Sequence, residues 1–251
     1  MRAGLLAPRN RRALNVQRGL GRLLSPLWVP LCVAIMRYGF RWRIEEVEQT
    51  RREFARLRRG STSPLLVCAN HLTMFDSLII AMALGSPWWF VVHYSALPWN
   101  TPEREHFANT WWKRALVYVM KCVPVTRGGD RRAVGATLGR LVYLMASGEV
   151  GLVFPEGGRS RTGHVDTEAV TYGVGRIVKA LPGCRVVCVY LRGEHQATWT
   201  NRPVAGERFR AAIEVFEPKT DQKGLRGSLD ITRQILGRLA AMERRHFDGR
   251  K

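Results

Sequence analysis

Short apolar runs alternate with helix-like segments along most of this 251-residue chain, and that alternation restricts the possible folds more than any other feature. Gly, Pro and polar residues bound the runs, as they do buried strands. Strands are predicted at 64–69, 88–94, 122–125, 150–154, 185–191 and 209–216, and helices at 45–59, 73–84, 103–120, 130–148, 169–181 and near 231–242. This alternation predicts an α/β fold with a central, largely parallel or mixed sheet flanked by helices.

The first 44 residues differ from the rest of the chain in their charge pattern. Six arginines precede position 23 and no acidic residue precedes position 45, whereas the stretch 23–36 carries no charge and contains Pro26 and Pro30. Because this stretch is shorter than the ~20 residues of a spanning helix, we expect residues 1–44 to be a helical membrane-associating segment that lies in the interface. A buried first helix is the alternative. Residues 45–251 are expected to form the main domain.

Composition restricts the partners and the compartment. The net charge is +20, and 34 of the 40 basic residues are arginine. Such a surface favours anionic partners: phospholipid headgroups, nucleic acid or an acidic carrier protein. The five cysteines follow neither a disulfide framework nor a zinc-ligand spacing, which predicts reduced thiols, a cytoplasmic setting and no metal site. We therefore expect a peripheral or monotopic protein on the cytoplasmic face of a membrane.

A histidine and an aspartate follow the first strong strand, in the run Asn70-His71-Leu72-Thr73-Met74-Phe75-Asp76. A histidine can take a proton near neutral pH, and a nearby carboxylate can orient its ring. Five residues along a regular helix would place the two side chains on different faces, so they meet only if the chain bends between them. The alternative is that Asp76 caps a helix beginning at Thr73 and that His71 is an ordinary loop residue. No Ser or Cys nucleophile signature accompanies the pair, which favours a base that activates a bound hydroxyl.

Two further loops with candidate site residues follow predicted strands. Residues 153–163 combine Glu156 with arginines on a glycine-rich turn, where the backbone can approach a ligand and arginine can hold a phosphate bidentately. Arg127 follows the strand at 122–125 and precedes a helix start. A plain surface turn and a solvated arginine are the alternatives. Because ligands of α/β sheets bind beyond the carboxyl ends of the strands, the three loops predict one shared site.

Together the three segments resemble the glycerolipid acyltransferases, which include lysophosphatidic acid and glycerol-3-phosphate acyltransferases. The family's first motif, Asn-His followed by four residues and Asp, is matched by Asn70, His71 and Asp76. Its third motif, Phe-Pro-Glu-Gly-x-Arg-Ser, is matched at every fixed position of 154–160. Its second motif ends in an arginine, here Arg127. The resemblance covers residues 64 to 193.

The resemblance implies an O-acyltransferase of phospholipid biosynthesis. It would move a fatty acyl group from acyl-CoA or acyl-carrier protein to a hydroxyl of a lysophospholipid-type acceptor, with 1-acylglycerol-3-phosphate as the family's default. His71 would be the general base and Asp76 its orienting carboxylate. The implied substrate-binding residues are Asn70, Arg127, Glu156, Gly157, Arg159 and Ser160. No cofactor is expected beyond the acyl thioester, which is a co-substrate.

The chain departs from the family pattern at three positions. The glycine that usually opens the second motif is Lys121, its usual aromatic is Pro124, and the proline of the fourth motif is Cys188. These changes bear on the acceptor more than on the reaction, so glycerol-3-phosphate, another lysolipid or an amino-acid lipid stay open as acceptors.

Apolar residues near the first motif are expected to line an acyl groove, unless they belong to the core: Leu78, Ile79, Trp88, Trp89 and Phe90. A family member that binds lipid without catalysis is a further alternative, against which the intact His71 and Asp76 argue. A basic nucleic-acid-binding module is the alternative from another class. No zinc-finger, RNP-type or helix-turn-helix signature supports it, so no nucleic-acid partner is expected.

Overall fold

A five-stranded mixed sheet forms the centre of the protein in a computed structural model that describes residues 6–60, 63–126 and 131–249. The strands lie in the order β1-β5-β4-β2-β3. Their bounds are β1 Arg43–Glu45, β2 Leu65–Ala69, β3 Val150–Val153, β4 Arg185–Gly193 and β5 Arg208–Phe216. Strand β2 is parallel to its neighbours β3 and β4, while β5 runs antiparallel to β4 and parallel to β1. The α/β class with a mixed sheet is therefore confirmed.

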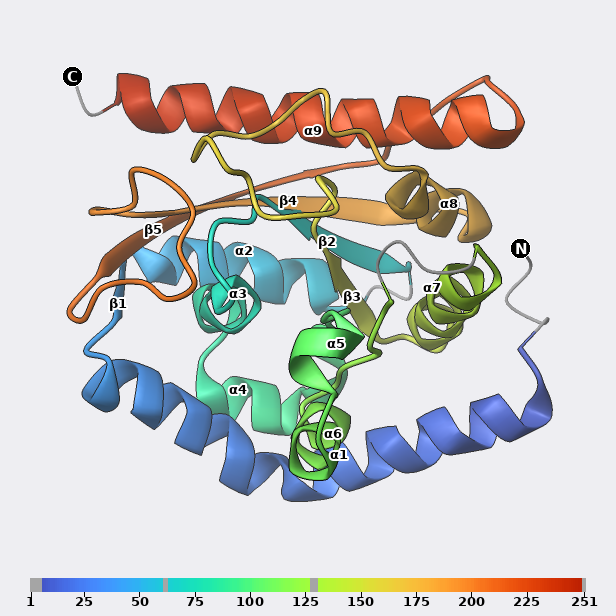
Figure 1. Cartoon of the computed structure of the whole chain (residues 1–251), viewed down its shortest axis with the longest axis horizontal. Helices are drawn as coiled ribbons and strands as arrows, with labels where there is room; N and C mark the ends of the chain where they lie inside the picture. The colour runs from blue at the N-terminus through green and yellow to red at the C-terminus, as the bar shows by residue number, and fades with distance from the viewer. Residues whose placement is uncertain (1–5, 61–62, 127–130, 250–251) are drawn as a thin grey trace.

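Helices flank both faces of this sheet. Their bounds are α1 Pro8–Ala34, α2 Val47–Arg58, α3 Asp76–Leu84, α4 Pro87–Val92, α5 Arg104–Phe107, α6 Trp111–Val119, α7 Arg131–Ala146, α8 Tyr172–Ala180 and α9 Gly224–Asp248. A π-helical turn (Ile35–Gly39) follows α1, and a short 3-10 helix (Tyr94–Ala96) follows α4. In Figure 1, α9 covers one side of the sheet, and α1 runs along the opposite side of the molecule with α4 and α6 packed against it.

Strand β2 is buried along its whole length. Leu66 and Cys68 join the apolar cluster that includes α7, α8 and α9, whereas Leu65, Val67 and Ala69 join the cluster that includes α2, α3 and α4. A strand covered on both faces needs such a continuous apolar run. Because β2, β3 and β4 are parallel neighbours, the loops that follow them leave the sheet at the same edge.

The strand predicted at 88–94 is wrong, because this segment contains the helix α4. The Ser86 hydroxyl accepts a hydrogen bond from the backbone N–H of Trp89 at 3.3 Å, and Pro87 occupies the first helical turn. Capping serine and N1 proline favour a helix start. An apolar run of this length does not by itself separate a strand from a buried helix.

Other elements also differ from the prediction. The helix expected at 103–120 is two helices, α5 and α6. The strand expected at 122–125 is reduced to isolated bridges at its two ends, Asn100 with Cys122 and Glu103 with Val125. Strand β1 was not predicted, since its three residues are charged at both ends and carry no apolar run.

Helix α1 continues through both of its prolines. Pro26 has no N–H to donate to the carbonyl of Arg22, four residues earlier. The buried hydroxyl of Ser25 donates to that carbonyl instead, at 2.8 Å. Because the Ser25 hydroxyl replaces the missing N–H donor, the helix continues past Pro26. Helix α1 is bowed along its length in Figure 1, as proline-containing helices are.

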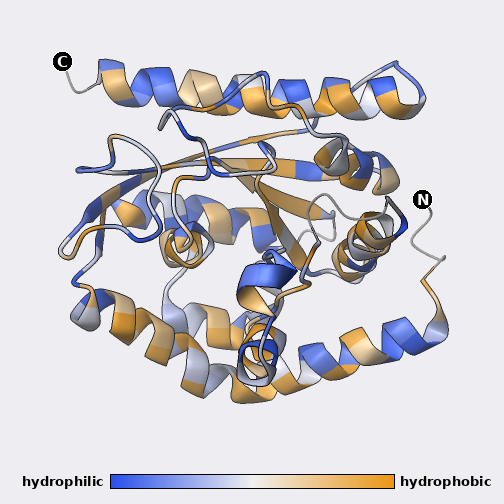
Figure 2. Cartoon of the chain, in the orientation of Figure 1, coloured by the Kyte–Doolittle hydropathy of each residue, from blue (hydrophilic) through white to orange (hydrophobic). Residues whose placement is uncertain are grey.

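The exposed side of α1 and of the π-helical turn that follows it carries a row of apolar residues. Exposed apolar residues recur at helical spacing: Val16, Leu20, Leu23, Leu27, Leu31 and Ile35. The buried face includes Gln17, which donates to the carbonyls of Tyr118 at 3.0 Å and Cys122 at 2.9 Å. A helix on the surface of a water-soluble protein has the reverse arrangement. Figure 2 shows the apolar residues concentrated in the half of α1 nearer its C-terminal end.

One helical stretch of the described chain, Pro8–Gly39, is long and apolar enough to cross a membrane, judged by length and composition only. Of its apolar window, 22% is buried within the protein, so packing against the core does not account for most of that apolar surface. The expectation of an apolar N-terminal helix is confirmed.

Candidate active site

His71 and Asp76 meet in the loop between β2 and α3. The Nδ1 atom of His71 lies 2.9 Å from Oδ2 of Asp76, and the two residues are 9% and 2% exposed. Helix α3 begins at Asp76 and not at Thr73, so the five-residue separation is spanned by a loop. The bend that the pair requires is therefore present.

The Asp76 carboxylate also holds the loop in place. Its Oδ2 accepts hydrogen bonds from the backbone N–H groups of Leu72 at 2.6 Å and Thr73 at 2.8 Å, and its Oδ1 accepts one from the Thr73 hydroxyl at 2.5 Å. The alternative that Asp76 caps a helix beginning at Thr73 is wrong, because α3 begins at Asp76 itself and has no side-chain cap, and Leu72 and Thr73 precede it. Since Oδ2 acts as an acceptor, Nδ1 of His71 is the donor, which leaves the lone pair of the neutral ring on Nε2.

The third-motif loop approaches His71 from the strand beside it. Phe154, directly after β3, stacks on the His71 ring with the centroids 3.9 Å apart and an angle of 13° between the planes. The backbone N–H of Ser160 donates to the carbonyl of His71 at 2.9 Å. Gly157 has a φ of 71°, and a Cβ there would lie 2.8 Å from Cγ2 of Thr171, so the turn requires glycine. The loops after β2 and β3 form one unit around His71.

Glu156 lies buried in this turn, at 7% exposure. Its Oε2 accepts a hydrogen bond from the backbone N–H of Asp166 at 3.2 Å. Burial raises the pKa of the Glu156 carboxyl to about 7, against the opposite effect of the backbone N–H groups of Asp166 and His71. A carboxyl with such a pKa holds a proton in part of the population near neutral pH and can then donate a hydrogen bond.

Arg159 extends from the same turn toward the loop that follows β4. Its Nη1 donates to Oδ1 of Asn201 at 2.8 Å and, at a longer 3.4 Å, to the carbonyl of Thr200. The centre of its guanidinium lies 4.8 Å from the ring centroid of Trp199. A cation over an aromatic face at this distance is attracted by the ring.

The other site residues expected from the sequence are engaged within the protein or lie outside the described residues. The Asn70 side chain donates to the carbonyl of Leu191 at 2.9 Å and accepts from its N–H at 2.8 Å, which extends the pairing of β2 with β4. The Ser160 hydroxyl donates to the carbonyl of His164. Arg127 lies outside the described residues.

His71 and Arg159 line the same cavity, which has a volume of about 370 Å³. Apolar side chains supply much of the remaining wall: Met74, Phe75, Leu78, Phe107, Leu116, Val117, Met120 and Phe154. The cavity therefore joins a candidate base, a cation and an apolar surface. This is the composition expected of a site for an amphiphilic ligand with an anionic end.

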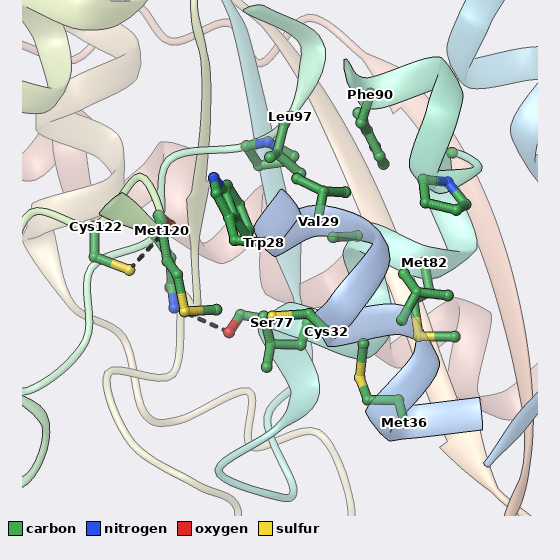
Figure 3. A pocket seen from close by; sticks show the side chains of 17 residues that line it. Trp28, Val29, Cys32, Met36, Ser77, Met82, Phe90, Leu97, Met120 and Cys122 are labelled. Atoms are coloured by element: carbon green, nitrogen blue, oxygen red, sulfur yellow. Dashed lines mark hydrogen bonds between the residues drawn. The ribbon is translucent and has the colours of Figure 1, made fainter. Parts of the chain in front are cut away.

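A second cavity of about 70 Å³ continues from the first toward α1. The two share Ser77, Leu78, Asn100, Met120 and Cys122, and the Asn100 amide donates to the Ser77 hydroxyl at 2.9 Å between them. Figure 3 shows Trp28, Val29 and Cys32 of α1 and Met36 of the π-helical turn on one wall of this cavity, with Met82 and Phe90 among the residues opposite.

Of the apolar residues predicted to line an acyl groove, some line the cavities, and the others lie in the core or on the surface. Leu78 lines both cavities and Phe90 lines the smaller one. Ile79 belongs to the core, Trp89 packs against it, and Trp88 is exposed. Among the described residues, no group of three or more His, Cys, Asp or Glu side chains is placed to hold a metal ion.

A profile of the Acyltransferase family matches residues 41–192. The chain belongs to the acyltransferase family. The matched range contains β1, β2, β3, all but the last residue of β4 and both loops that meet at His71. The family domain, which supports acyltransferase activity, therefore carries His71, Asp76 and Arg159. No curated protein matches the chain.

Lys121 stands where acyltransferases of this kind usually have a glycine, and it has a φ of 54°, in the left-handed region that glycine favours. Its side chain is fully buried and donates to Oε2 of Glu149 at 2.5 Å and to the carbonyl of Tyr94 at 2.8 Å. Burial lowers the pKa of Lys121 to about 8, against the opposite effect of Glu149. Lys121, in place of the usual glycine, thus forms a buried ion pair with Glu149.

The loop after β4 is the part of the site that the sequence analysis missed. Trp199 and Asn201 contact Arg159, and the signal for them was available, because residues 185–191 were predicted as a strand. The rule that site loops follow the carboxyl ends of parallel strands applies to that strand as well. The loop after β4, however, carries no recognisable motif.

Proposed function

We propose that this acyltransferase moves a fatty acyl group from acyl-CoA or acyl-carrier protein to the hydroxyl of 1-acylglycerol-3-phosphate, in phospholipid biosynthesis. The observation that carries the proposal is the shared cavity, which brings the ring of His71, the guanidinium of Arg159 and an apolar wall together. The proposed acceptor, 1-acylglycerol-3-phosphate, has a hydroxyl for His71, a phosphate for Arg159 and an acyl chain for the apolar wall.

In the proposed reaction, the acceptor hydroxyl donates a hydrogen bond to Nε2 of His71. His71 takes the hydroxyl proton as the oxygen attacks the thioester carbonyl, and Asp76 stabilises the imidazolium that forms. The tetrahedral intermediate then breaks its carbon–sulfur bond, and the departing thiolate takes the proton from His71. A general base contributes about 10²–10⁴ in rate, so the positioning of two bound substrates supplies much of the rest.

The acceptor phosphate is proposed to bind Arg159, with Arg127 as a second cation. Arginine holds phosphate bidentately and keeps its charge at all relevant pH values. Gly157 gives the turn its shape, and the protonated Glu156 carboxyl is proposed to donate to an acceptor oxygen. Asn70 and Ser160, whose polar groups are bonded within the protein, take positioning roles in this proposal.

The acyl chain is proposed to lie along the apolar wall of the larger cavity, with its end directed toward the smaller cavity beneath α1. Leu78 and Met120 line both cavities and stand between them. Apolar surface of this kind favours a hydrocarbon chain over water, by roughly 0.8 kcal/mol for each buried methylene.

We also propose that residues 1–44 attach the protein to the cytoplasmic face of a membrane, and that residues 45–251 form the catalytic domain. The exposed apolar face of α1 supports the attachment. Exposed apolar residues of neighbouring helices add to it: Trp88 and Val92 of α4, and Trp111, Trp112 and Leu116 of α6. Tryptophan is favoured at membrane interfaces, and arginine binds anionic headgroups.

The test is to incubate the purified full-length protein with labelled acyl-CoA or acyl-carrier protein and a panel of acceptors, and to identify the lipid formed. The panel contains 1-acylglycerol-3-phosphate, glycerol-3-phosphate, other lysophospholipids and an amino-acid lipid. We expect phosphatidic acid from the first acceptor. Product from a different acceptor alone would replace the proposed substrate, and oligonucleotide binding without any transfer would support the nucleic-acid alternative.

His71→Ala tests the mechanism in the same assay. Transfer should be abolished while the thermal unfolding midpoint stays close to that of the parent protein. His93→Ala is a matched control, because His93 is an exposed histidine that stacks on Trp89 and lines neither cavity. Substantial transfer by a folded His71→Ala protein would rule out the proposed base.

A further inference from the structure

The loop between β4 and β5 contacts the His71 loop through its backbone. Residues 198–201, here called the bridging segment, run beside that loop. The N–H of Thr200 donates to the carbonyl of Leu72 at 3.0 Å, and the N–H of Met74 donates to the carbonyl of Asn201 at 3.2 Å. These bonds lie on the two sides of Thr73, so the bridging segment is attached to the His71 loop irrespective of its own side chains.

The bridging segment also runs along the third-motif loop. The hydroxyl of Thr198 donates to the carbonyl of Arg161 at 2.9 Å. Gly163 has a φ of 78°, and a Cβ at this position would collide with the carbonyl of Ala197, so glycine allows the two loops to come this close. The segment therefore contacts both loops that form the candidate site.

Two side chains of the bridging segment, those of Trp199 and Asn201, contact Arg159. Asn201 accepts a hydrogen bond from Nη1, and Trp199 lies under the guanidinium. Within the part of the chain that the structure describes, the hydrogen bonds of Arg159 involve Nη1 alone, so Nε and Nη2 are available to a ligand in the cavity that Arg159 lines.

We propose that Trp199 and Asn201 are positioning residues that set the guanidinium of Arg159 for the phosphate of the acceptor. The proposal rests on the proposed function, in which Arg159 binds that phosphate. An arginine held on two sides loses less side-chain freedom when it binds, and its remaining N–H groups can meet phosphate oxygens in a fixed plane. Both residues lie beyond residue 192, where the family match ends, so part of the acceptor site comes from outside the matched region.

The experiment compares Asn201→Ala and Trp199→Leu with the parent in the full-length protein. Steady-state kcat and KM are measured with 1-acylglycerol-3-phosphate and with a monoacylglycerol, which lacks the phosphate. For the phosphate-bearing acceptor we expect KM to rise about tenfold in Asn201→Ala, which removes a hydrogen bond to a charged group, and about threefold in Trp199→Leu. The kcat, the KM for the acyl thioester and the kinetics with monoacylglycerol should stay within twofold.

Two further variants separate positioning from general structural damage. Trp199→Phe keeps an aromatic ring under Arg159 and should restore most of the parent KM. Val204→Ala is the matched control, because Val204 belongs to the same loop, is 53% exposed and is not among the hydrogen-bond or ring partners of Arg159. If Trp199→Leu does not fold, Asn201→Ala and Trp199→Phe decide the question.

Arg159→Ala, measured in parallel, distinguishes failure of this inference from failure of the proposed function. An unchanged acceptor KM in Arg159→Ala would overturn both. A raised KM in Arg159→Ala with unchanged KM in Asn201→Ala and Trp199→Leu would overturn the positioning role alone. A loss of kcat with both acceptors would also overturn it, because the segment would then act on His71.

Discussion

The Asp76 carboxylate makes one contact that matters for chemistry and three that matter for the loop. Its bond to His71 orients the ring, and its bonds to Leu72 and Thr73 hold the backbone on which His71 is mounted. Because one oxygen, Oδ2, takes part in both, substitutions at this position are expected to change activity and stability together.

Replacing Asp76 by Asn keeps the side-chain size and changes the partner of Nδ1 of His71. An amide nitrogen donates where the carboxylate accepted, which favours the tautomer whose Nε2 is protonated and unable to act as a base. We expect kcat to fall by about 10²–10⁴-fold. The free energy of unfolding should fall by about 1–3 kcal/mol, because the loop N–H groups lose an acceptor. Steady-state kinetics and urea denaturation measure the two effects.

Thr73→Val is the control for Asp76→Asn. It removes the hydroxyl bond to Oδ1 and leaves the contact between His71 and Asp76 in place. Stability should drop by about 1 kcal/mol with kcat little changed. Near-parental kcat in Asp76→Asn would contradict the orienting role.

The raised pKa of Glu156 should make the free energy of unfolding depend on pH. Its pKa is raised to about 7 in the folded protein from an ordinary value of 4.5, because burial disfavours the charged form. The stabilisation is therefore fully present below pH 4.5 and is lost as pH rises through 7, to a total of about 3 kcal/mol. In Glu156→Gln this loss should vanish, so the unfolding free energy of the parent should fall relative to that of the variant by about 3 kcal/mol between pH 4.5 and 7.5. Parallel pH profiles from denaturant titrations would refute the assignment.

From the sequence, His71 and Asp76 could meet only if the chain bends between them, and the structure has this bend. The prediction placed the helix start three residues too early, because Thr73 has the residue type of an N-cap but bonds to the Asp76 carboxylate instead. The strand predicted at 185–191 indicated that a loop follows it at this edge of the sheet, but not which residues of that loop contact Arg159. Asn201 lies 42 residues beyond Arg159, and their contact depends on how the two loops pack.

At the scale of elements, hydrophobic runs identified β2, β3, β4 and β5 because each has a strong apolar pattern on at least one face. The same signal failed at 88–94, where a short apolar run forms a helix, and at β1, where pairing with β5 makes a strand of residues with no strand pattern. Capping residues would have corrected the first error. The second depends on tertiary pairing, which local sequence does not encode.

The passage of α1 through Pro26 predicts a specific role for Ser25. In Ser25→Ala the carbonyl of Arg22 loses the buried hydroxyl that replaces the missing proline N–H. We expect the free energy of unfolding to fall by about 1–3 kcal/mol, measured by thermal or urea denaturation. Ser147→Ala is the control, because its hydroxyl makes a similar bond to Tyr143 at an exposed position, where water can replace it. Equal effects of the two substitutions would contradict the argument.

At the scale of the whole molecule, the apolar face of α1 and the family domain lie side by side. Helices α4 and α6 pack against α1, and α6 also supplies Leu116 and Val117 to the wall of the larger cavity. The surface proposed to meet the membrane is thus continuous with the wall of the candidate site. A net charge of +20 would add attraction to anionic lipid, and salt would weaken that part.

Introducing charge on the exposed face of α1 should weaken membrane binding. Leu23 and Leu27 are 74% and 72% exposed, and burying each leucine in lipid is worth roughly 2 kcal/mol. We expect Leu23→Glu and Leu27→Glu each to lower affinity for phosphatidylglycerol vesicles at least about tenfold in a sedimentation assay. Leu225→Glu on α9, at the opposite side of the molecule in Figure 1, is the control. Unchanged sedimentation of the α1 variants would exclude this face as the docking surface.

An enzyme attached to a bilayer through α1 would encounter its lipid acceptor in two dimensions. Turnover would then follow the mole fraction of acceptor in the leaflet, not its amount per litre of suspension. Diluting the acceptor with inert phospholipid at constant total acceptor should slow the reaction, whereas adding more vesicles of unchanged composition should not.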